Sequence, residues 1–136
     1  IRAVALAVIQ NKEGKLLIEK SYDSVKQETF YRALGGGIEM GETGAEAVKR
    51  ELLEELGVDA NVGERLCVIE NIFTYEGAPG HQIMLVYPCT FKDEALYTQE
   101  NLTLIEQQER FAVWRTPSEI KAEGAVLHPA EMLDYL

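Results

Sequence analysis

The sequence has 136 residues, of which 46% are hydrophobic and 26% charged, and this size predicts one globular domain over residues 1–136. Its net charge of -10 would repel a nucleic-acid backbone, so no nucleic-acid polymer is expected as a partner, whereas a small phosphorylated ligand is compatible if a cation mediates the contact. We expect no membrane span, because no apolar run is long enough, and the given sequence does not open with the pattern of a signal peptide. Two cysteines without a CxxC motif and two histidines exclude a zinc finger and a disulfide scaffold, and they predict a protein of the reducing cytoplasm. The first residue is Ile1 rather than Met, and we expect the native N-terminus to lie upstream.

The first third of the chain predicts strands followed by a helix. Residues 2–9 and 15–19 are rich in aliphatic side chains and flank a turn signal at residues 11–14, so we expect them to form a hairpin. A third short strand is predicted over residues 30–34, before a loop of consecutive glycines at 35–37. Thr43 and Gly57 are typical of the residues that begin and end a helix, and they predict a helix over residues 44–56.

The rest of the chain predicts a second strand pair and two further helices. Residues 62–75 and 81–91 read as two strands around a turn at 76–80, and this register places Cys67 opposite Cys89 as two reduced core thiols. Pro88 indicates a sheet edge or a bulge within the second strand. A polar loop (92–101), a strand (110–114), a helix beginning near Thr116 and a closing helix (129–136) complete the pattern, which is typical of an α/β sandwich with a mixed sheet.

Three glutamates share one face of the helix predicted over residues 44–56. At about 100° per residue, Ala45, Val48, Leu52 and Leu56 form the face that would pack on a sheet, with Leu53 beside it. Glu51, Glu54 and Glu55 fall on a separate arc, where only the small Ala47 accompanies them. Their charges repel one another and oppose the helix dipole, so either a solvated acidic face or a bound divalent cation explains them.

The glycine run before this helix favours the cation. Consecutive glycines let a backbone approach a ligand closely, and their carbonyl and N–H groups can meet a metal or phosphate oxygens. A glycine run alone is more often a plain turn, but a glycine loop that leads into a helix with three glutamates is a much rarer combination.

Residues 36–58 resemble the Nudix box, Gly-x5-Glu-x7-Arg-Glu-U-x-Glu-Glu-x-Gly-U with U aliphatic. Every fixed position is filled without a gap, by Gly36, Glu42, Arg50, Glu51, Leu52, Glu54, Glu55, Gly57 and Val58. The family usually has proline before its glycine pair, where this chain has Leu34, a change that removes no ligand.

The resemblance implies a Nudix-type α/β/α sandwich with a mixed central sheet, and a pyrophosphohydrolase that uses Mg²⁺ or Mn²⁺ to cleave nucleoside diphosphate derivatives. It implies that Glu51, Glu54 and Glu55 hold the metal with the backbone carbonyl of Gly35. Gly36, Glu42, Arg50 and Gly57 would organise the loop and the helix. Family members are often homodimers, although the sequence does not fix the oligomeric state.

The general base and the substrate are less closely defined. Glu51 and Glu54 are the catalytic candidates in the box, with Glu54 favoured as the base, and Glu109 is the main candidate beyond it, beside Glu100 and Glu106. Arg32, Phe73 and Tyr75 are candidates for substrate binding, although each also reads as an ordinary surface or strand residue. A nucleoside triphosphate, a dinucleoside polyphosphate and a nucleotide sugar all remain open as substrates. The alternatives to an enzyme are a Nudix-fold nucleotide sensor without turnover and a structural protein with an acidic helix.

Overall fold

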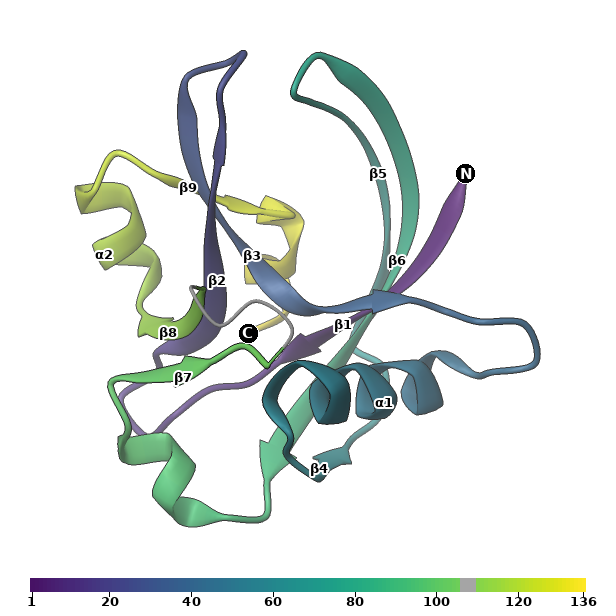
Figure 1. The fold of residues 1–136 in the computed structure, drawn as a ribbon, viewed down its shortest axis with the longest axis vertical. Coiled ribbons are helices and arrows are strands. Elements are labelled where there is room, and N and C mark those ends of the chain that lie inside the picture. The colour runs from purple at the N-terminus through teal and green to yellow at the C-terminus, as the bar shows by residue number, and fades with distance from the viewer. Residues whose placement is uncertain (106–109) are drawn as a thin grey trace.

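The computed structural model describes residues 1–105 and 110–136, and Figure 1 shows their arrangement. Within them, nine strands form one sheet in the order β4-β6-β1-β3-β2-β8-β7, with β5 paired to β6 and β9 paired to β3. The strands are β1 (Arg2–Val8), β2 (Leu16–Asp23), β3 (Glu28–Gly37), β4 (Ala60–Val62), β5 (Cys67–Tyr75), β6 (Ala78–Phe91), β7 (Asn101–Thr103), β8 (Phe111–Arg115) and β9 (Val126–His128). The helices are α1 (Gly44–Leu56), α2 (Pro117–Ala122) and the 3₁₀ helices η1 (Glu94–Thr98) and η2 (Ala130–Tyr135).

The sheet is mixed and has helices on both faces, which confirms the predicted α/β sandwich. β1 runs parallel to β6, and β3 parallel to β9, while the other pairings are antiparallel. On one face, α1 packs Ala47, Val48 and Leu52 into a core with Leu34 and Trp114. On the other, Ile120 of α2 and Met132 of η2 enter a second core, built on alternate residues of the same strands.

The predicted hairpin of the first two strands is wrong. β1 and β2 meet only at the isolated bridge between Gln10 and Leu16, because β3 lies between them in the sheet. The first part of β3 pairs with β2 and its glycine end pairs with β1, where Leu6 faces Gly35. The predicted glycine loop is therefore the end of a strand.

The predicted register of the two cysteines is also wrong. The turn between β5 and β6 contains only Glu76 and Gly77, both with positive φ, so Tyr75 faces Ala78 rather than His81. Cys67 consequently lies opposite Val86, and Cys89 lies opposite Val62 of β4. Both thiols are free and buried, as expected, but they belong to different cores. Burial raises the pKa of the Cys89 thiol to about 12.

The other differences from the predicted elements are local. The strand expected over 62–75 is two strands, and the N–H of Gly63 between them donates to the carbonyl of Pro88 at 2.8 Å. Pro88 thus lies where β6 changes partners from β5 to β4, and not at a sheet edge. The loop expected at 92–101 contains η1, and the closing helix is the 3₁₀ helix η2. On α1, the predicted packing face is confirmed, with Val48 and Leu52 buried and Ala45 and Leu56 against the same core. Two neighbours differ from the prediction: Ala47 is fully buried and Leu53 is exposed.

Candidate active site

Helix α1 is fixed at both ends by the caps that the sequence predicted. The Thr43 hydroxyl accepts from the N–H of Glu46, and the Glu46 carboxylate accepts from the N–H of Thr43, which completes a capping box. Gly57 ends the helix at φ 70°, and its N–H donates to the carbonyl of Leu53. These caps set the position of the box glutamates along the helix.

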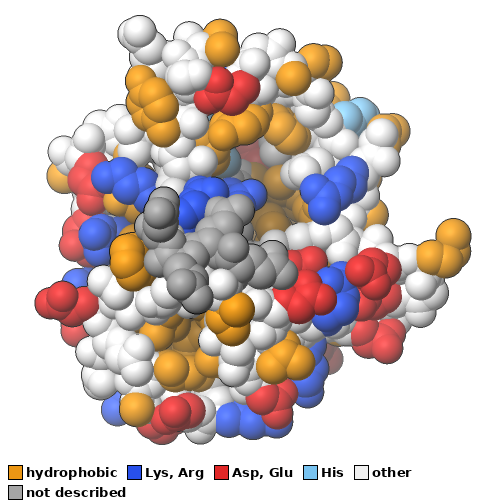
Figure 2. Space-filling view, in the orientation of Figure 1, with side chains coloured by type: hydrophobic (Ala, Val, Ile, Leu, Met, Phe, Trp, Pro, Cys, Tyr) orange, Lys and Arg blue, Asp and Glu red, His pale blue; other side chains and the backbone are white. Residues whose placement is uncertain are grey.

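Arg50 joins the helix to the loop in front of it. Its Nε and Nη2 donate to the two carboxylate oxygens of Glu42 at 2.8 and 2.9 Å, and Nη2 also donates to the carbonyl of Gly37. Its Nη1 lies 3.1 Å from Glu51 and 3.2 Å from Glu54. The hydrogen bonds from Arg50 lower the pKa of the Glu42 carboxyl to about 2, so this pair stays charged under all ordinary conditions. Figure 2 shows acidic side chains gathered around a basic one on this part of the surface.

Glu51 lies against the backbone of the glycine run. A Cβ placed on Gly36 would fall 2.4 Å from Oε1 of Glu51, and a Cβ on Gly35, which has φ 144°, would overlap the carbonyl of Ala5. Only glycine fits at both positions, because the Glu51 carboxylate lies against the backbone of Gly36 and β1 lies against the backbone of Gly35.

Glu55 is the most perturbed carboxyl of the box. Its pKa is raised to about 8, first by burial and then by the neighbouring Glu51 and Glu19, while Arg32 acts in the opposite direction. Glu55 therefore keeps its proton at neutral pH, and its ionised form would meet the charge of Glu51, within electrostatic range of Glu19 and Arg32.

These donors fit a divalent cation in their chemistry. Carboxylate oxygens with a nearby glycine carbonyl are the hard ligands that Mg²⁺ and Mn²⁺ prefer, and a cation would relieve the repulsion between Glu51 and Glu55. Over residues 1–105 and 110–136, no three acidic, histidine or cysteine side chains are arranged as a ready metal site. Glu54, which is about half exposed, is held by Arg50 and would have to leave it to join the other two.

The candidate bases beyond the box are not brought to these carboxylates by any described contact. Glu100 is exposed between η1 and β7. Glu106 and Glu109 lie outside the described residues. Of the residues flanking that segment, Ile105 donates its N–H to the carbonyl of Glu55 at 2.8 Å, and Arg110 pairs with Glu19.

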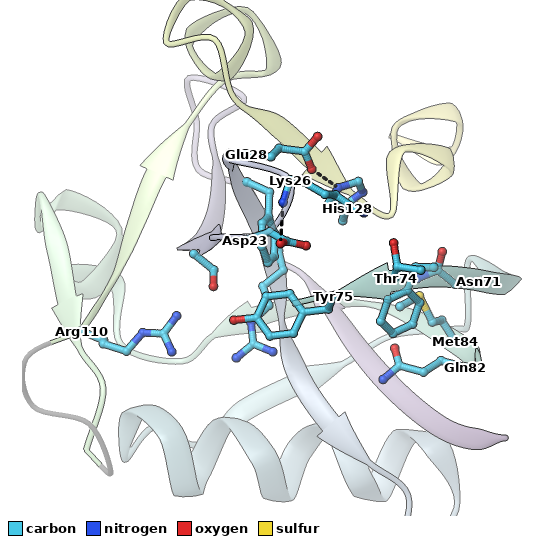
Figure 3. Close-up of a pocket in the computed structure, with 14 residues that line it drawn as sticks. Asp23, Lys26, Glu28, Asn71, Thr74, Tyr75, Gln82, Met84, Arg110 and His128 are labelled. Atoms are coloured by element: carbon cyan, nitrogen blue, oxygen red, sulfur yellow. Dashed lines mark hydrogen bonds and ion pairs between the residues drawn. The ribbon is translucent and has the colours of Figure 1, made fainter. Parts of the chain in front are cut away.

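A pocket of about 320 Å³ lies between the hairpins β2–β3 and β5–β6 (Figures 2 and 3). All three predicted substrate-binding residues, Arg32, Phe73 and Tyr75, line it. Tyr75 meets Phe30 edge-to-face at 5.9 Å, and the Phe73 ring covers Gly80, where a Cβ would lie 2.3 Å from it. The remaining lining residues are Ser21, Asp23, Lys26, Glu28, Phe30, Asn71, Thr74, Gln82, Met84, Arg110 and His128.

The tips of the two hairpins are joined at one end of the pocket. The buried carboxylate of Asp23 accepts from the N–H groups of Val25 and Lys26 on its own turn, and from the N–H of Glu76 on the other hairpin. The side chain of Glu76 in turn accepts from the backbone and hydroxyl of Ser24. Burial acts to raise the pKa of Asp23, but the three backbone donors outweigh it and lower the pKa. Asp23 therefore holds the aromatic end of the pocket in shape.

The sequence patterns did not indicate several residues that the structure places in this region. Glu19 is almost fully buried on β2, and it pairs with both Arg32 and Arg110. Asn71 and Gln82 face each other across β5 and β6 and present two carboxamides to the pocket. The one available signal was the charge of Glu19 directly after three apolar residues, 16–18, of the same strand.

Comparisons with known proteins agree with this fold and box. The family described as NUDIX domain matches residues 1–136, and the chain belongs to this family. A CTP pyrophosphohydrolase of Escherichia coli K12 is 37% identical over 59 residues, which are 43% of this chain and 44% of that protein, so the match spans less than half of that relative.

Solved structures extend the likeness over nearly the whole chain. The solution structure of the E. coli ORF135 protein is 27% identical, with a TM-score of 0.58 over 97% of this chain and 84% of that one. The crystal structure of a MutT NUDIX hydrolase from Burkholderia pseudomallei is 21% identical, with a TM-score of 0.72 over 99% and 97% of the two chains, and it supports the fold alone.

No helix among the described residues is both long and apolar enough to cross a bilayer.

Proposed function

We propose that this protein hydrolyses the pyrophosphate linkage of a nucleotide derivative in a reaction that depends on Mg²⁺ or Mn²⁺. Membership of the Nudix family and the partial match to a CTP pyrophosphohydrolase support hydrolysis of this kind. The observation that carries the proposal is the position of Arg32, which lines the aromatic pocket and also lies within electrostatic range of Glu55. One ligand can therefore place a base in the pocket and a phosphate chain at the box.

The proposed substrate is a nucleoside triphosphate, and CTP is the first to test because of the E. coli relative. The pocket combines ring faces from Phe30, Phe73 and Tyr75 with the carboxamides of Asn71 and Gln82. Aromatic faces stack on any base, while carboxamides donate and accept hydrogen bonds along its edge. Dinucleoside polyphosphates and nucleotide sugars belong in the same assay as alternatives.

In the proposed mechanism Glu51, Glu55 and the carbonyl of Gly35 would hold the cation, and Glu54 would join them or accept the proton of the attacking water. The chemistry that a divalent cation supplies at such carboxylates is neutralisation of phosphate oxygens and acidification of water. Arg50 and Glu42 keep the loop against the helix, and Gly36 gives Glu51 the room it occupies. Glu109 remains the alternative base, next to Arg110 in the chain.

The experiment is product analysis on a panel of nucleoside triphosphates, dinucleoside polyphosphates, nucleotide sugars, ADP-ribose, NADH and coenzyme A, each with Mg²⁺, Mn²⁺ or EDTA. Metal-dependent cleavage of one class supports the proposal and names the substrate. A panel without turnover, together with a melting temperature that rises with metal and nucleotide, would instead support the sensor.

The compartment, the domain and the oligomeric state of the protein are also proposals. We propose that the protein works in the cytoplasm, where its two free thiols stay reduced. We also propose that residues 1–136 form one domain, and that its state, monomer or homodimer, is to be measured by light scattering.

A further inference from the structure

Glu19 is a buried carboxylate between two strands, each of which brings it an arginine. Its side chain is 4% exposed on β2, opposite Arg32 of β3 on one side and Ala112 of β8 on the other. Nη2 of Arg32 lies 3.2 Å from its Oε2, and Nη2 of Arg110 lies 2.7 Å from its Oε1. Two guanidinium groups therefore lie against one buried carboxylate, in a protein whose net charge is -10.

Stability alone is a poor explanation for this arrangement. Apolar residues usually stabilise a buried position at least as well as an ion pair, because the charges lose their hydration. Residues 16–18, directly before Glu19, are apolar and buried. A charge at position 19 therefore loses hydration that an apolar side chain would not lose, which is a cost to stability. Such a cost indicates a use for the two arginines that Glu19 holds.

The two arginines lie at the pocket, and one of them also lies near the box. Both line the pocket, and Figure 3 shows the Arg110 side chain extending toward Tyr75. Arg32 also lies within electrostatic range of Glu55 of the box. A guanidinium group binds phosphate oxygens through two parallel hydrogen bonds, and a guanidinium that is already held in place loses less freedom on binding.

We propose that Glu19, Arg32 and Arg110 form a phosphate clamp, in which the two arginines bind phosphate oxygens and Glu19 is the positioning residue that holds them. This inference rests on the proposed function and narrows its substrate class. A clamp with two arginines favours a nucleoside triphosphate over a nucleotide sugar, since the triphosphate chain carries more negative charge than the diphosphate of the sugar derivative.

The test is the binding of inorganic triphosphate in EDTA at pH 7, measured by calorimetry, which needs neither a base nor a metal nor turnover. Loss of one charge-assisted contact should weaken binding about tenfold, so Arg32→Gln and Arg110→Gln should each raise Kd by about that factor. Arg115→Gln is the matched control, because Arg115 is also paired with a glutamate, Glu123, at similar exposure but does not line the pocket. Its Kd should equal that of the wild type.

Glu19→Gln tests the positioning role through the sign of its effect. If Glu19 acted only through its charge, removing that charge would tighten the binding of an anion. The clamp predicts the opposite, a Kd about three- to tenfold higher, at the scale of one weakened charge-assisted contact. In an Arg32→Gln/Arg110→Gln background, the same change should not weaken binding further.

The binding constants of these variants either support the clamp or overturn it. Unchanged Kd in both arginine variants, or tighter binding by Glu19→Gln, overturns the clamp. If Glu19→Gln does not fold, Arg32→Lys replaces it as the test, at a half-exposed position. Lysine keeps the positive charge but lacks the two parallel N–H donors of the guanidinium group, so the clamp predicts weaker binding of triphosphate. Clamp-dependent binding without hydrolysis of any nucleotide would contradict the proposed function and leave the clamp standing.

Discussion

Glu55 gives the sharpest prediction, because its charge should destabilise the free protein and also hold the metal. Its pKa is raised from 4.5 to about 8, first by burial and then by Glu51 and Glu19. The unfolded chain loses this proton near pH 4.5, whereas the folded protein keeps it until about pH 8. The free energy of unfolding therefore falls as pH rises through this window.

The size of this change in unfolding free energy follows from the pH range over which the folded protein holds the Glu55 proton and the unfolded chain does not. A difference of one proton changes the unfolding free energy by about 1.4 kcal/mol per pH unit, so the step from pH 6 to pH 8 costs on the order of 2 kcal/mol. For a chain of this length that is roughly 5–10 °C in Tm. Glu55→Gln has no proton to lose, so in EDTA the variant should gain about this much over the wild type between pH 6 and pH 8.

The assay is a series of melting curves at pH 6, 7 and 8, in EDTA and in millimolar Mn²⁺. Because the metal needs the ionised carboxylate, the stabilisation of the wild type by Mn²⁺ should grow with pH, and Glu55→Gln should lose most of it. Glu64→Gln, an exposed glutamate off the site, controls for the loss of one charge. Parallel pH curves for wild type and Glu55→Gln in EDTA, or an undiminished Mn²⁺ effect in the variant, would refute this reasoning.

Three other substitutions test the supports of the site. Gly36→Ala adds a Cβ 2.4 Å from the Glu51 carboxylate, which must move by about 1 Å, so kcat/KM should fall about tenfold or more while Tm changes by a few degrees; full activity would contradict the contact. Arg50→Lys keeps the charge but cannot bridge both oxygens of Glu42 and the carbonyl of Gly37, so both Tm and kcat should fall, and a variant with wild-type melting would show that the bridge is dispensable. Asp23→Asn weakens the hydrogen bonds that join the tips of the two hairpins. Because the pKa of Asp23 is lower in the folded protein than in the unfolded chain, its carboxylate stabilises the wild type above the unfolded pKa, and this stabilisation is lost as pH falls through the folded pKa. Melting curves from pH 2 to 7 should therefore show a lower Tm for the variant at pH 7 and a weaker dependence of Tm on pH in the acid range.

The parts of the fold that the sequence predicted well are those fixed by neighbours in the chain. The α1 helix begins and ends where Thr43 and Gly57 indicated, because capping involves residues three or four apart. The Arg50–Glu42 bridge spans only eight residues, and both belong to the same motif. Local chemistry therefore determined most of the box.

The errors concern contacts between distant residues. Nothing near residues 2–19 indicates that β3 inserts between β1 and β2, since that pairing depends on the whole sheet. The turn after Tyr75 offered glycines at 77 and 80, and the tight turn at Glu76 and Gly77 shifted the register of both cysteines. Glu19 was missed because one of its two partners, Arg110, comes from the far end of the chain.

The most direct test of the central claim is the rate of pyrophosphate release from CTP and the other nucleoside triphosphates, by wild type and Glu55→Gln side by side. We expect release by the wild type with Mg²⁺ or Mn²⁺, none in EDTA, and a loss of at least about a hundredfold in a Glu55→Gln variant that still melts cooperatively. Turnover of any nucleotide that persists in EDTA, or that Glu55→Gln retains at the wild-type rate, would contradict the assignment of the box carboxylates as the catalytic centre.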